Sequence, residues 1–335
     1  MGKPEVFENE ELGVLEDKTE ALTLHSKRTE RLKKRQTRKA QEKHVQKSHD
    51  LLNLPYELII DVLVFLGPGD IITLKRVSKS FHAFITQEEH TIAKVINATR
   101  FQCLENCFRL PVLLSDVDPA MHYYLKDPER QELMTIHRKP YFQHVQQPDP
   151  AEICTCLTCL LRWLALCIVV DFAYWQDHLD KGEPIPMIPP GRFPEWNQSL
   201  VVRNAALVRK ALYSPLCYSR LLELHLNSTV RSIRRHAPNK SIQRQRFHMT
   251  QDDADSGADH WLSRSGPPTY DFPYYRYNYY MLESWLPNRS WSSDLNQWMY
   301  LPAEQHDRDL EFVVKWAVRR KSAGKQAVAN GGLSN

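Results

Sequence analysis

A block of helical periodicity, broken once by glycine and proline, constrains this chain more than any other feature. Apolar residues recur every three or four positions through 54–66 (LPYELIIDVLVFL) and again through 71–85 (IITLKRVSKSFHAFI), which is the spacing of one face of an α-helix. Pro55 suits a first helical turn, Gly67-Pro68-Gly69 ends that helix, and Asp70 can cap the next. A unit of about 45 residues is too small to bury a sufficient core alone. Something else must therefore cover part of its apolar surface.

Charge is concentrated in the residues before this block. Residues 1–20 hold seven acidic and two basic side chains, whereas residues 27–47 hold ten basic and two acidic ones. The whole chain has 44 basic and 40 acidic residues and a formal charge of +4, so the remainder is nearly neutral. Segments of like charge bury too little apolar surface to offset their chain entropy. We therefore expect residues 1–49 to form a charged tail that is disordered or a solvated helix.

The basic segment also admits a functional interpretation. A run of lysine and arginine is typical of a nuclear-import signal or a nucleic-acid contact, and here that run comprises Lys33, Lys34, Arg35, Arg38 and Lys39. A solvated tail is the commoner explanation, and the small net charge argues against a general nucleic-acid binder. An alternative hypothesis is thus a nuclear protein that binds nucleic acid through residues 27–47.

Cysteine usage and hydropathy indicate the compartment. The chain has seven cysteines, and its first twenty residues contain no apolar stretch, which predicts free thiols in the cytoplasm or nucleus. The most apolar stretch, 163–170, is bracketed by Arg162 and Asp171 and is shorter than the roughly 20 residues of a membrane span. We expect a buried helix there and no membrane contact.

The rest of the chain has a mostly helical pattern. We predict helices at 88–107, 151–180, 198–213, 216–236 and 303–321, with a proline-rich irregular stretch at 182–196 and a polar loop at 238–268. Strand-like alternation is weak, so the predicted class is mainly α with room for small β elements. The predicted organisation is a tail at 1–49, a helical motif at 50–96, a larger helical domain at 97–322 and a disordered tail at 323–335.

Two groups of side chains could carry chemistry. A tetrahedral zinc site needs four N or S ligands, and one such set is Cys103, Cys107, Cys156 and Cys159. Packed free thiols are the simpler interpretation. Acidic residues and His306 lie together at 305–309 (QHDRD), where helix capping explains the acidic residues better than acid–base catalysis does. The sequence has no hydrolase, metalloprotease or nucleotide-binding motif, so we expect no catalytic residue, bound metal or cofactor.

The helical block resembles the F-box, a three-helix motif. The matching residues are Leu54-Pro55-x-Glu57-Leu58, Asp70-Ile71-Ile72, Leu74, Val77-Ser78-Lys79 and Phe81, where the family often has Trp. The resemblance implies that the segment docks on the Skp adaptor of a cullin-RING ubiquitin ligase. It also implies which residues contact that adaptor or shape the contacting surface: Leu54, Pro55, Leu58, Leu74, Val77 and Phe81.

Residues 97–321 also resemble the C-terminal regions of uncharacterised F-box proteins of filamentous fungi, through stretches such as CLLRWLALCIVVDFAYWQ. The part after an F-box generally recruits the client for ubiquitylation, so the resemblance implies a non-catalytic substrate adaptor with an unknown client. Eleven aromatic residues in 270–300 are the best candidates for client binding, although core packing explains them more simply. A second alternative is a protein organised by structural zinc at 154–159.

Overall fold

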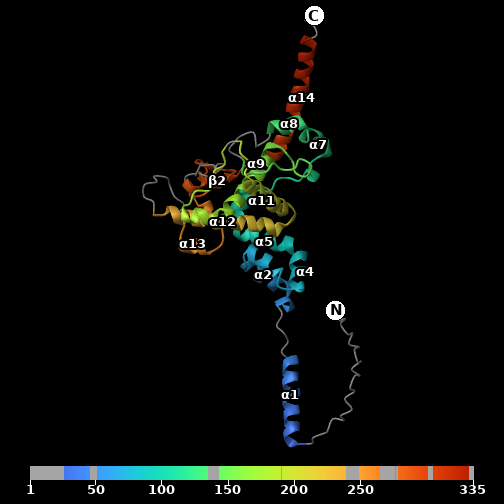
Figure 1. The fold of residues 1–335 in the computed structure, drawn as a ribbon, viewed down its shortest axis with the longest axis vertical. Coiled ribbons are helices and arrows are strands. Elements are labelled where there is room, and N and C mark those ends of the chain that lie inside the picture. Colours follow the sequence, from blue (N-terminus) through green and yellow to red (C-terminus); the bar gives the residue numbers. More distant parts are fainter. Residues whose placement is uncertain are drawn as a thin grey trace, which may run out of the picture. The chain divides into compact units, whose positions relative to one another are not determined.

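The fold is built almost entirely from helices. The computed structural model describes residues 26–45, 51–134, 143–189, 191–238, 249–264, 276, 278–300 and 305–331. Within these residues lie fourteen α-helices and one two-stranded antiparallel sheet (Figure 1), which confirms the predicted mainly α class with small β elements. The chain divides into two compact units, Met1–Leu54 and Pro55–Asn335, and each is described by itself.

The first unit contains a single long helix, α1 (Lys27–Val45), and the short 3-10 helix η1 (Leu51–Asn53). The side chains of residues 27–38 are nearly all exposed, so α1 is a solvated charged helix, one of the two forms expected of this segment. Residues 1–25 and 46–50 lie outside the described residues, so the charged tail expected there stays a prediction.

The second unit begins with four helices, α2 (Tyr56–Phe65), α3 (Pro68–Leu74), α4 (Lys79–Gln87) and α5 (Glu89–Arg100). As the sequence predicts, α2 begins directly after Pro55. The predicted second helix is wrong in two respects: α3 already begins at Pro68, so Asp70 lies inside its first turn and does not cap it, and the range 71–85 is divided between α3 and α4, which Ser78 caps. The inner faces of these helices are fully buried and aliphatic. They consist of Ile59, Leu63, Ile71, Ile85, Ile92 and Ile96.

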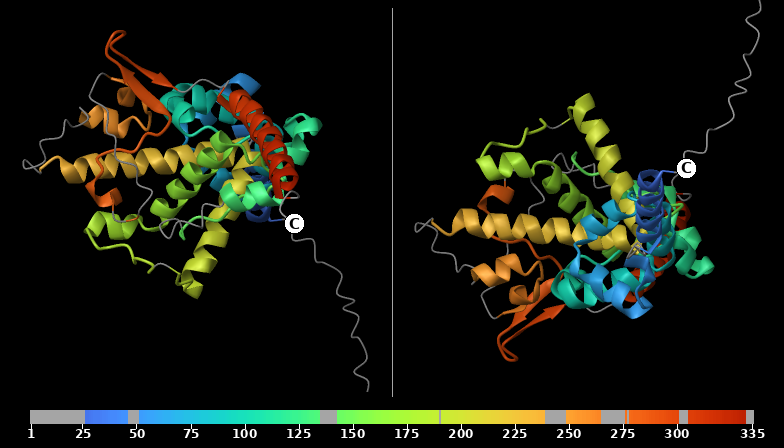
Figure 2. Two further views of the ribbon diagram at one scale, coloured as in Figure 1. Left: turned by 90° about the horizontal axis from the view of Figure 1, so that it is seen from above. Right: turned by 90° about the horizontal axis from the view of Figure 1, so that it is seen from below.

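The helix α12 (Pro215–His236) links these four helices to the rest of the unit. It packs against α3 and α5 and also against α9 (Leu157–Tyr174) and α11 (Glu195–Tyr213), and Figure 2 shows it crossing the body in yellow to orange. Glu223 of α12 accepts a hydrogen bond from the backbone N–H of Gly69 at 3.0 Å. The helix α12 therefore covers apolar surface of α3 and α5 that the four short helices are too small to bury among themselves.

The helix α9 forms the centre of the core. It is apolar and long enough to cross a membrane by length and composition alone, but 67% of that stretch is buried inside the protein, as expected of a core helix. Its Asp171 is buried and pairs with the buried Arg276 through two contacts of 3.0 Å. A further hydrogen bond joins Arg276 to Asn197 of α11 at 3.1 Å, so a closed polar network lies inside the apolar core.

Several short elements and the long C-terminal helix α14 complete the unit around α9 and α12. The helices are α6 (Gln102–Cys107), η2 (Leu114–Asp116), α7 (Pro119–Leu125), α8 (Pro128–Met134), α10 (Gln176–Lys181), α13 (Gln251–Asp255), η5 (His260–Ser263), η6 (Asn278–Met281) and α14 (Gln305–Gly331). The strands β1 (Arg289–Ser292) and β2 (Gln297–Tyr300) form a hairpin in which Trp291 lies opposite Trp298.

Two predicted boundaries differ from the structure. Within the predicted polar loop, residues 249–264 are ordered: Thr250 and Asp253 form a capping box at the start of α13, and Trp261 and Leu262 are buried. A few apolar residues in a polar stretch anchor it to the core, which the average polarity of that stretch concealed. The helix α14 also runs to Gly331, past residue 322 where we expected a disordered tail.

Candidate protein-docking surface

The helix α2 is apolar on two faces, and only one of them is covered. Ile59, Ile60 and Leu63 point into the core. Leu58, Val62 and Phe65 follow one another at the spacing of a second helical face and are exposed. Because a helix that is apolar on both sides is normally buried on both, the outer face of α2 is a surface that a partner could cover.

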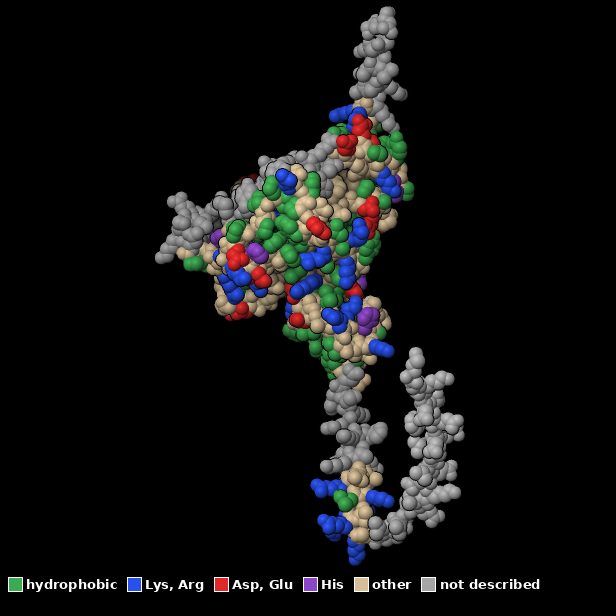
Figure 3. All heavy atoms as spheres, viewed as in Figure 1, with side chains coloured by type: hydrophobic (Ala, Val, Ile, Leu, Met, Phe, Trp, Pro, Cys, Tyr) green, Lys and Arg blue, Asp and Glu red, His purple; other side chains and the backbone are tan. Residues whose placement is uncertain are grey.

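The surface continues beyond this helix face. We define the exposed apolar set as Tyr56, Leu58, Val62 and Phe65 of α2 together with Val77, which lies between α3 and α4. Leu58 is 49% exposed, Val77 68% and Phe65 82%. Figure 3 shows hydrophobic side chains gathered over this end of the unit. Exposed apolar side chains on neighbouring elements are typical of protein–protein contact sites.

The predicted contact residues differ in how accessible they are. Leu54, Pro55, Leu58 and Val77 are exposed, whereas Leu74 and Phe81 are half-buried, so the latter two are better placed to support the surface than to form its centre. Sequence reasoning omitted three members of the exposed apolar set, which are Tyr56, Val62 and Phe65. The signal for Val62 and Phe65 was present in the spacing of 58, 62 and 65, but periodicity alone does not say which of two apolar faces turns outward; Tyr56 lies outside that spacing.

Local hydrogen bonds fix the segments that carry this surface. Ser78 Oγ accepts from the backbone N–H of Phe81 at 3.2 Å and so caps α4. Arg100 of α5 donates to the carbonyl oxygens of Phe65 and Leu66 at 2.6 and 3.2 Å, which satisfies the C-terminal end of α2. The Tyr56 hydroxyl donates to Glu88 at 2.6 Å, and this hydrogen bond raises the pKa of Tyr56.

A charged contact joins this region to α12. Glu89 pairs with Lys75 at 3.0 Å and accepts hydrogen bonds from the Ser214 hydroxyl and the Leu216 backbone. Burial raises the pKa of Glu89, but the hydrogen bonds from Ser214 and Lys75 outweigh it, and the net direction is downward. The carboxylate is thus ionised and holds α3, α5 and the start of α12 together.

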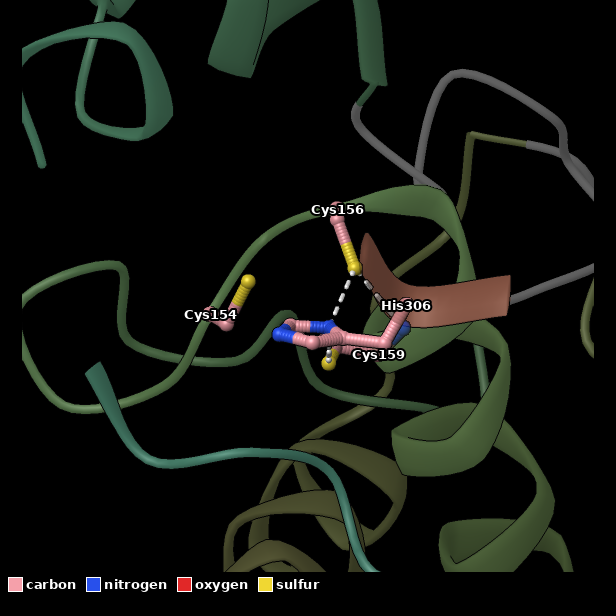
Figure 4. Close-up of side chains that lie close together, drawn as sticks. All are labelled: Cys154, Cys156, Cys159 and His306. Carbon is pink, nitrogen blue, oxygen red and sulfur yellow. Dashed lines mark hydrogen bonds between the residues drawn. The ribbon is translucent and has the colours of Figure 1, made fainter. Parts of the chain in front are cut away.

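A group of residues of the kinds that can ligate a metal lies elsewhere, and its membership corrects the predicted zinc set. Ligand atoms of Cys154, Cys156, Cys159 and His306 all lie within 4.8 Å of one another (Figure 4). Cys103 and Cys107 are not part of this group; they form a separate buried pair on α6, and the hydrogen bond from Cys107 lowers the pKa of Cys103 to about 6. The predicted set lacked Cys154 and His306. Cys154 lies in the same short stretch as Cys156 and Cys159, whereas no local pattern reveals the contact with His306, about 150 positions away.

The three clustered thiols influence one another strongly. Hydrogen bonds from Cys156 and Cys159 lower the pKa of Cys154 to about 4. The hydrogen bond with Cys154 raises the pKa of Cys159, and the one with Cys156 raises the pKa of His306. When ionisable groups lie this close together, the pKa of one is lowered and that of its neighbour is raised.

Asp309, one of the acidic residues near His306, caps a helix as predicted, but not the helix to which it belongs. Asp309 accepts hydrogen bonds from the backbone N–H and the hydroxyl of Thr158, the former at 2.7 Å. Asp309 therefore caps the first turn of α9 and not its own helix. It can do so because the start of α14 lies beside the start of α9. Capping is confirmed as the function of this carboxylate, on another helix.

Half of the aromatic residues that the structure describes between 270 and 300 lie in the core, and Tyr280, Trp291 and Tyr300 are half-buried. Tyr279, Trp285 and Trp298 are buried. Tyr279 stacks on Phe172 of α9 with ring centroids 3.8 Å apart, and the Trp285 ring meets Phe108 edge-on at 5.5 Å. These three residues therefore pack the core and are not available to a client; residues 265–275 and 277 lie outside the described part.

Comparison with known proteins identifies the first helices of the second unit and the turn before them. Residues 51–92 match the F-box domain model. No curated protein and no solved structure matches the chain, so the likeness to fungal F-box proteins stays a prediction. F-box domains in general bind the Skp adaptor of cullin-RING ubiquitin ligases, and the proteins that carry them are typically non-catalytic. Residues 51–92, which include α2, α3 and α4 and the exposed apolar set, are an F-box domain.

Proposed function

We propose that this chain is a substrate-recognition adaptor of a Skp–cullin–F-box ubiquitin ligase. Its F-box domain docks on the Skp adaptor through the exposed apolar set and Leu54, and the helical remainder recruits a client. The observation that carries the proposal is the exposed outer face of α2 within the domain that the family model matches. The adaptor itself performs no chemistry, since it raises the rate of ubiquitin transfer by holding the client near the charged ubiquitin carrier.

The surface has the features of a protein-binding site. Its centre is apolar and aromatic, as the energetic centre of an interface usually is. The helices beneath it are held by the Ser78 cap and the Arg100 contacts described above, so little ordering entropy is lost on docking. The packing of α3 and α5 on α12 ties the docking end to the proposed client-binding region.

The experiment is affinity purification of the tagged full chain, followed by identification of the bound proteins. We expect the Skp adaptor and a cullin with the wild type, and their loss with the double variant Leu58→Asp plus Val77→Asp. The matched control is Val202→Asp plus Leu207→Asp on α11, at residues that are 60% and 45% exposed. Retention of the Skp adaptor by a folded Leu58/Val77 variant would overturn the proposal.

The same experiment separates the client from the ligase. A client bound by residues 97–322 stays with the Leu58/Val77 variant after the Skp adaptor is lost, and it accumulates because it is no longer ubiquitylated. Proteins that disappear together with the Skp adaptor belong to the ligase. If no protein remains with the variant and none accumulates, the client-recruiting part of the proposal is wrong.

A further inference from the structure

Three cysteines and one histidine from distant parts of the second unit converge on one point. Cys154, Cys156 and Cys159 lie just before and within the first turn of α9, and His306 lies in the first turn of α14. Figure 4 shows the imidazole ring among the three sulfur atoms. We propose that these four residues bind one structural Zn²⁺ ion, which joins the start of α14 to the start of α9.

The donor atoms fit this ion in kind and number. Three thiolate sulfurs and one imidazole nitrogen make a complete tetrahedral set of the type found in structural zinc sites. Soft sulfur ligands favour Zn²⁺ over Mg²⁺ or Ca²⁺, which prefer oxygen. Because four protein ligands leave no position for water or substrate, the ion would stabilise the fold and would not catalyse a reaction.

The spacing of the donor atoms also fits. His306 Nδ1 lies 3.3 Å from Cys156 Sγ and 3.4 Å from Cys159 Sγ. With Zn–S bonds of about 2.3 Å and Zn–N bonds of about 2.0 Å, ideal tetrahedral geometry places a nitrogen and a sulfur about 3.5 Å apart and two sulfurs about 3.8 Å apart. The four ligand atoms, all within 4.8 Å of one another, therefore need only small shifts to surround one ion.

Surrounding groups would support the charge of such a site. The backbone N–H of Val112 points at Cys159 Sγ, and that of Cys159 points at Cys156 Sγ, both at 3.4 Å, as is usual in the outer shell of a metal site. Zn²⁺ with three thiolates and a neutral imidazole carries one negative charge. The buried guanidinium of Arg130, which donates to the carbonyl oxygen of Thr155 at 2.6 Å, can balance it.

Arg130 gives an independent reason to expect negative charge here. Among the described residues it forms no ion pair, and its partners are the carbonyl and hydroxyl of Thr155 and the carbonyl of Leu125. A buried cation without a direct ion pair is costly, and the carboxylates of Asp127 and Asp309 offset that cost only through space. Thr155 lies between Cys154 and Cys156, so thiolates bound to zinc would add counter-charge close to the guanidinium.

Simple packing of free thiols explains the site less well. The cysteines lie in a small apolar cluster with Leu114, Val117, Leu125 and Val313, and buried cysteines often behave as small apolar residues. An imidazole ring among them is not apolar, and the thiols are its hydrogen-bonding partners. A cluster this small also gains most from a cross-link between residues 159 and 306, which are distant in the sequence.

The test begins with the metal content of the purified full chain. We expect about one zinc ion per chain, its loss in Cys156→Ser and in His306→Ala, and its retention in the matched control Cys167→Ser, a buried cysteine of α9 outside the cluster. Because a ligand variant could fail to fold, the wild type is also treated with a zinc chelator. We expect release of the ion together with a lower Tm, and intense visible absorption when Co²⁺ replaces Zn²⁺.

The outcomes are distinct from those of the adaptor proposal. A folded wild-type chain that contains no zinc and whose Tm is unaffected by the chelator would overturn the metal site. Retention of zinc by both ligand variants would overturn it as well. Neither result bears on Skp binding, because the F-box domain contains none of the four ligands.

Discussion

Burial decides which single residues control the stability of this protein. Asp171 and Arg276 are both buried and bonded to each other, whereas Glu311 and Lys315 form an exposed pair on one helix. Ionic groups in the interior have lost their hydration and depend on their partners, but exposed pairs are screened by water. His225 is also buried, against Phe108 with ring centroids 4.4 Å apart. A positive charge on this imidazole would lose its hydration in the same way.

We predict that Asp171→Asn lowers the free energy of unfolding by about 3–5 kcal/mol, because it leaves the Arg276 charge buried without a counter-charge. Urea-induced unfolding of the full chain measures this change. Glu311→Gln is the matched control and should cost less than about 0.5 kcal/mol, since that pair is exposed. Similar decreases in the free energy of unfolding in the two variants would show that the buried pair of Asp171 and Arg276 does not stabilise the core more than an exposed pair does.

We also predict a pH dependence that originates at His225. Burial lowers the pKa of His225 to about 4, while an unfolded histidine has its usual pKa of about 6.5. Between these values the unfolded chain binds the extra proton, so stability is complete above about pH 6.5 and falls as the pH is lowered towards 4. The loss from this residue is about 3 kcal/mol.

The measurement for His225 is the free energy of unfolding at several pH values in the wild type and in His225→Gln. The difference between the two curves should change between about pH 6.5 and pH 4 and be flat above that range. This comparison removes other titrating groups, such as Asp259, whose pKa burial raises to about 7. His82→Gln, at an exposed position, is the control. A difference curve that is flat throughout would contradict the prediction.

At the scale of elements, the sequence predicted most helices and few of the contacts between them. The helices α2, α9, α11, α12 and α14 overlap the ranges that apolar periodicity predicted, because periodicity reports the local geometry of the chain. The ends are less accurate: the predicted helix 151–180 corresponds to α9 and α10, and α14 extends beyond 321. Periodicity did not reveal which face of α2 is outward, or that η5 anchors a polar stretch through Trp261. Both depend on which other element lies opposite, and that is a property of tertiary packing.

The outer face of α2 leads to a prediction about Phe65. This side chain is 82% exposed, so Phe65→Ala should leave stability nearly unchanged while weakening Skp binding at least about tenfold, or about 1.4 kcal/mol. Titration of the adaptor into each variant gives the affinity, and thermal unfolding gives the stability. The matched control is Phe193→Ala, since Phe193 is similarly exposed outside the domain. Equal affinities for wild type and Phe65→Ala would remove this residue from the docking surface.

At the scale of the whole molecule, the F-box domain and the remainder are parts of one folded unit from Pro55 onward. The sequence divided them at residue 96, because the motif ends near there. The structure shows α3 and α5 packed on α12, and the contacts of Gly69 with Glu223 and of Glu89 with Ser214 cross that boundary. Likewise, the predicted zinc set contained only Cys156 and Cys159 of the four clustered residues, and only the folded chain brings His306 to the cysteines at 154–159.

The central claim is that this unit docks on the Skp adaptor through the exposed apolar set of its F-box domain. The most direct measurement is a titration of the purified full chain with the purified Skp adaptor. We predict saturable binding by the wild type and by the Val202→Asp plus Leu207→Asp control, and loss of binding with Leu58→Asp plus Val77→Asp at unchanged helical content. No binding by the wild type, or equal binding by all three proteins, would contradict the claim.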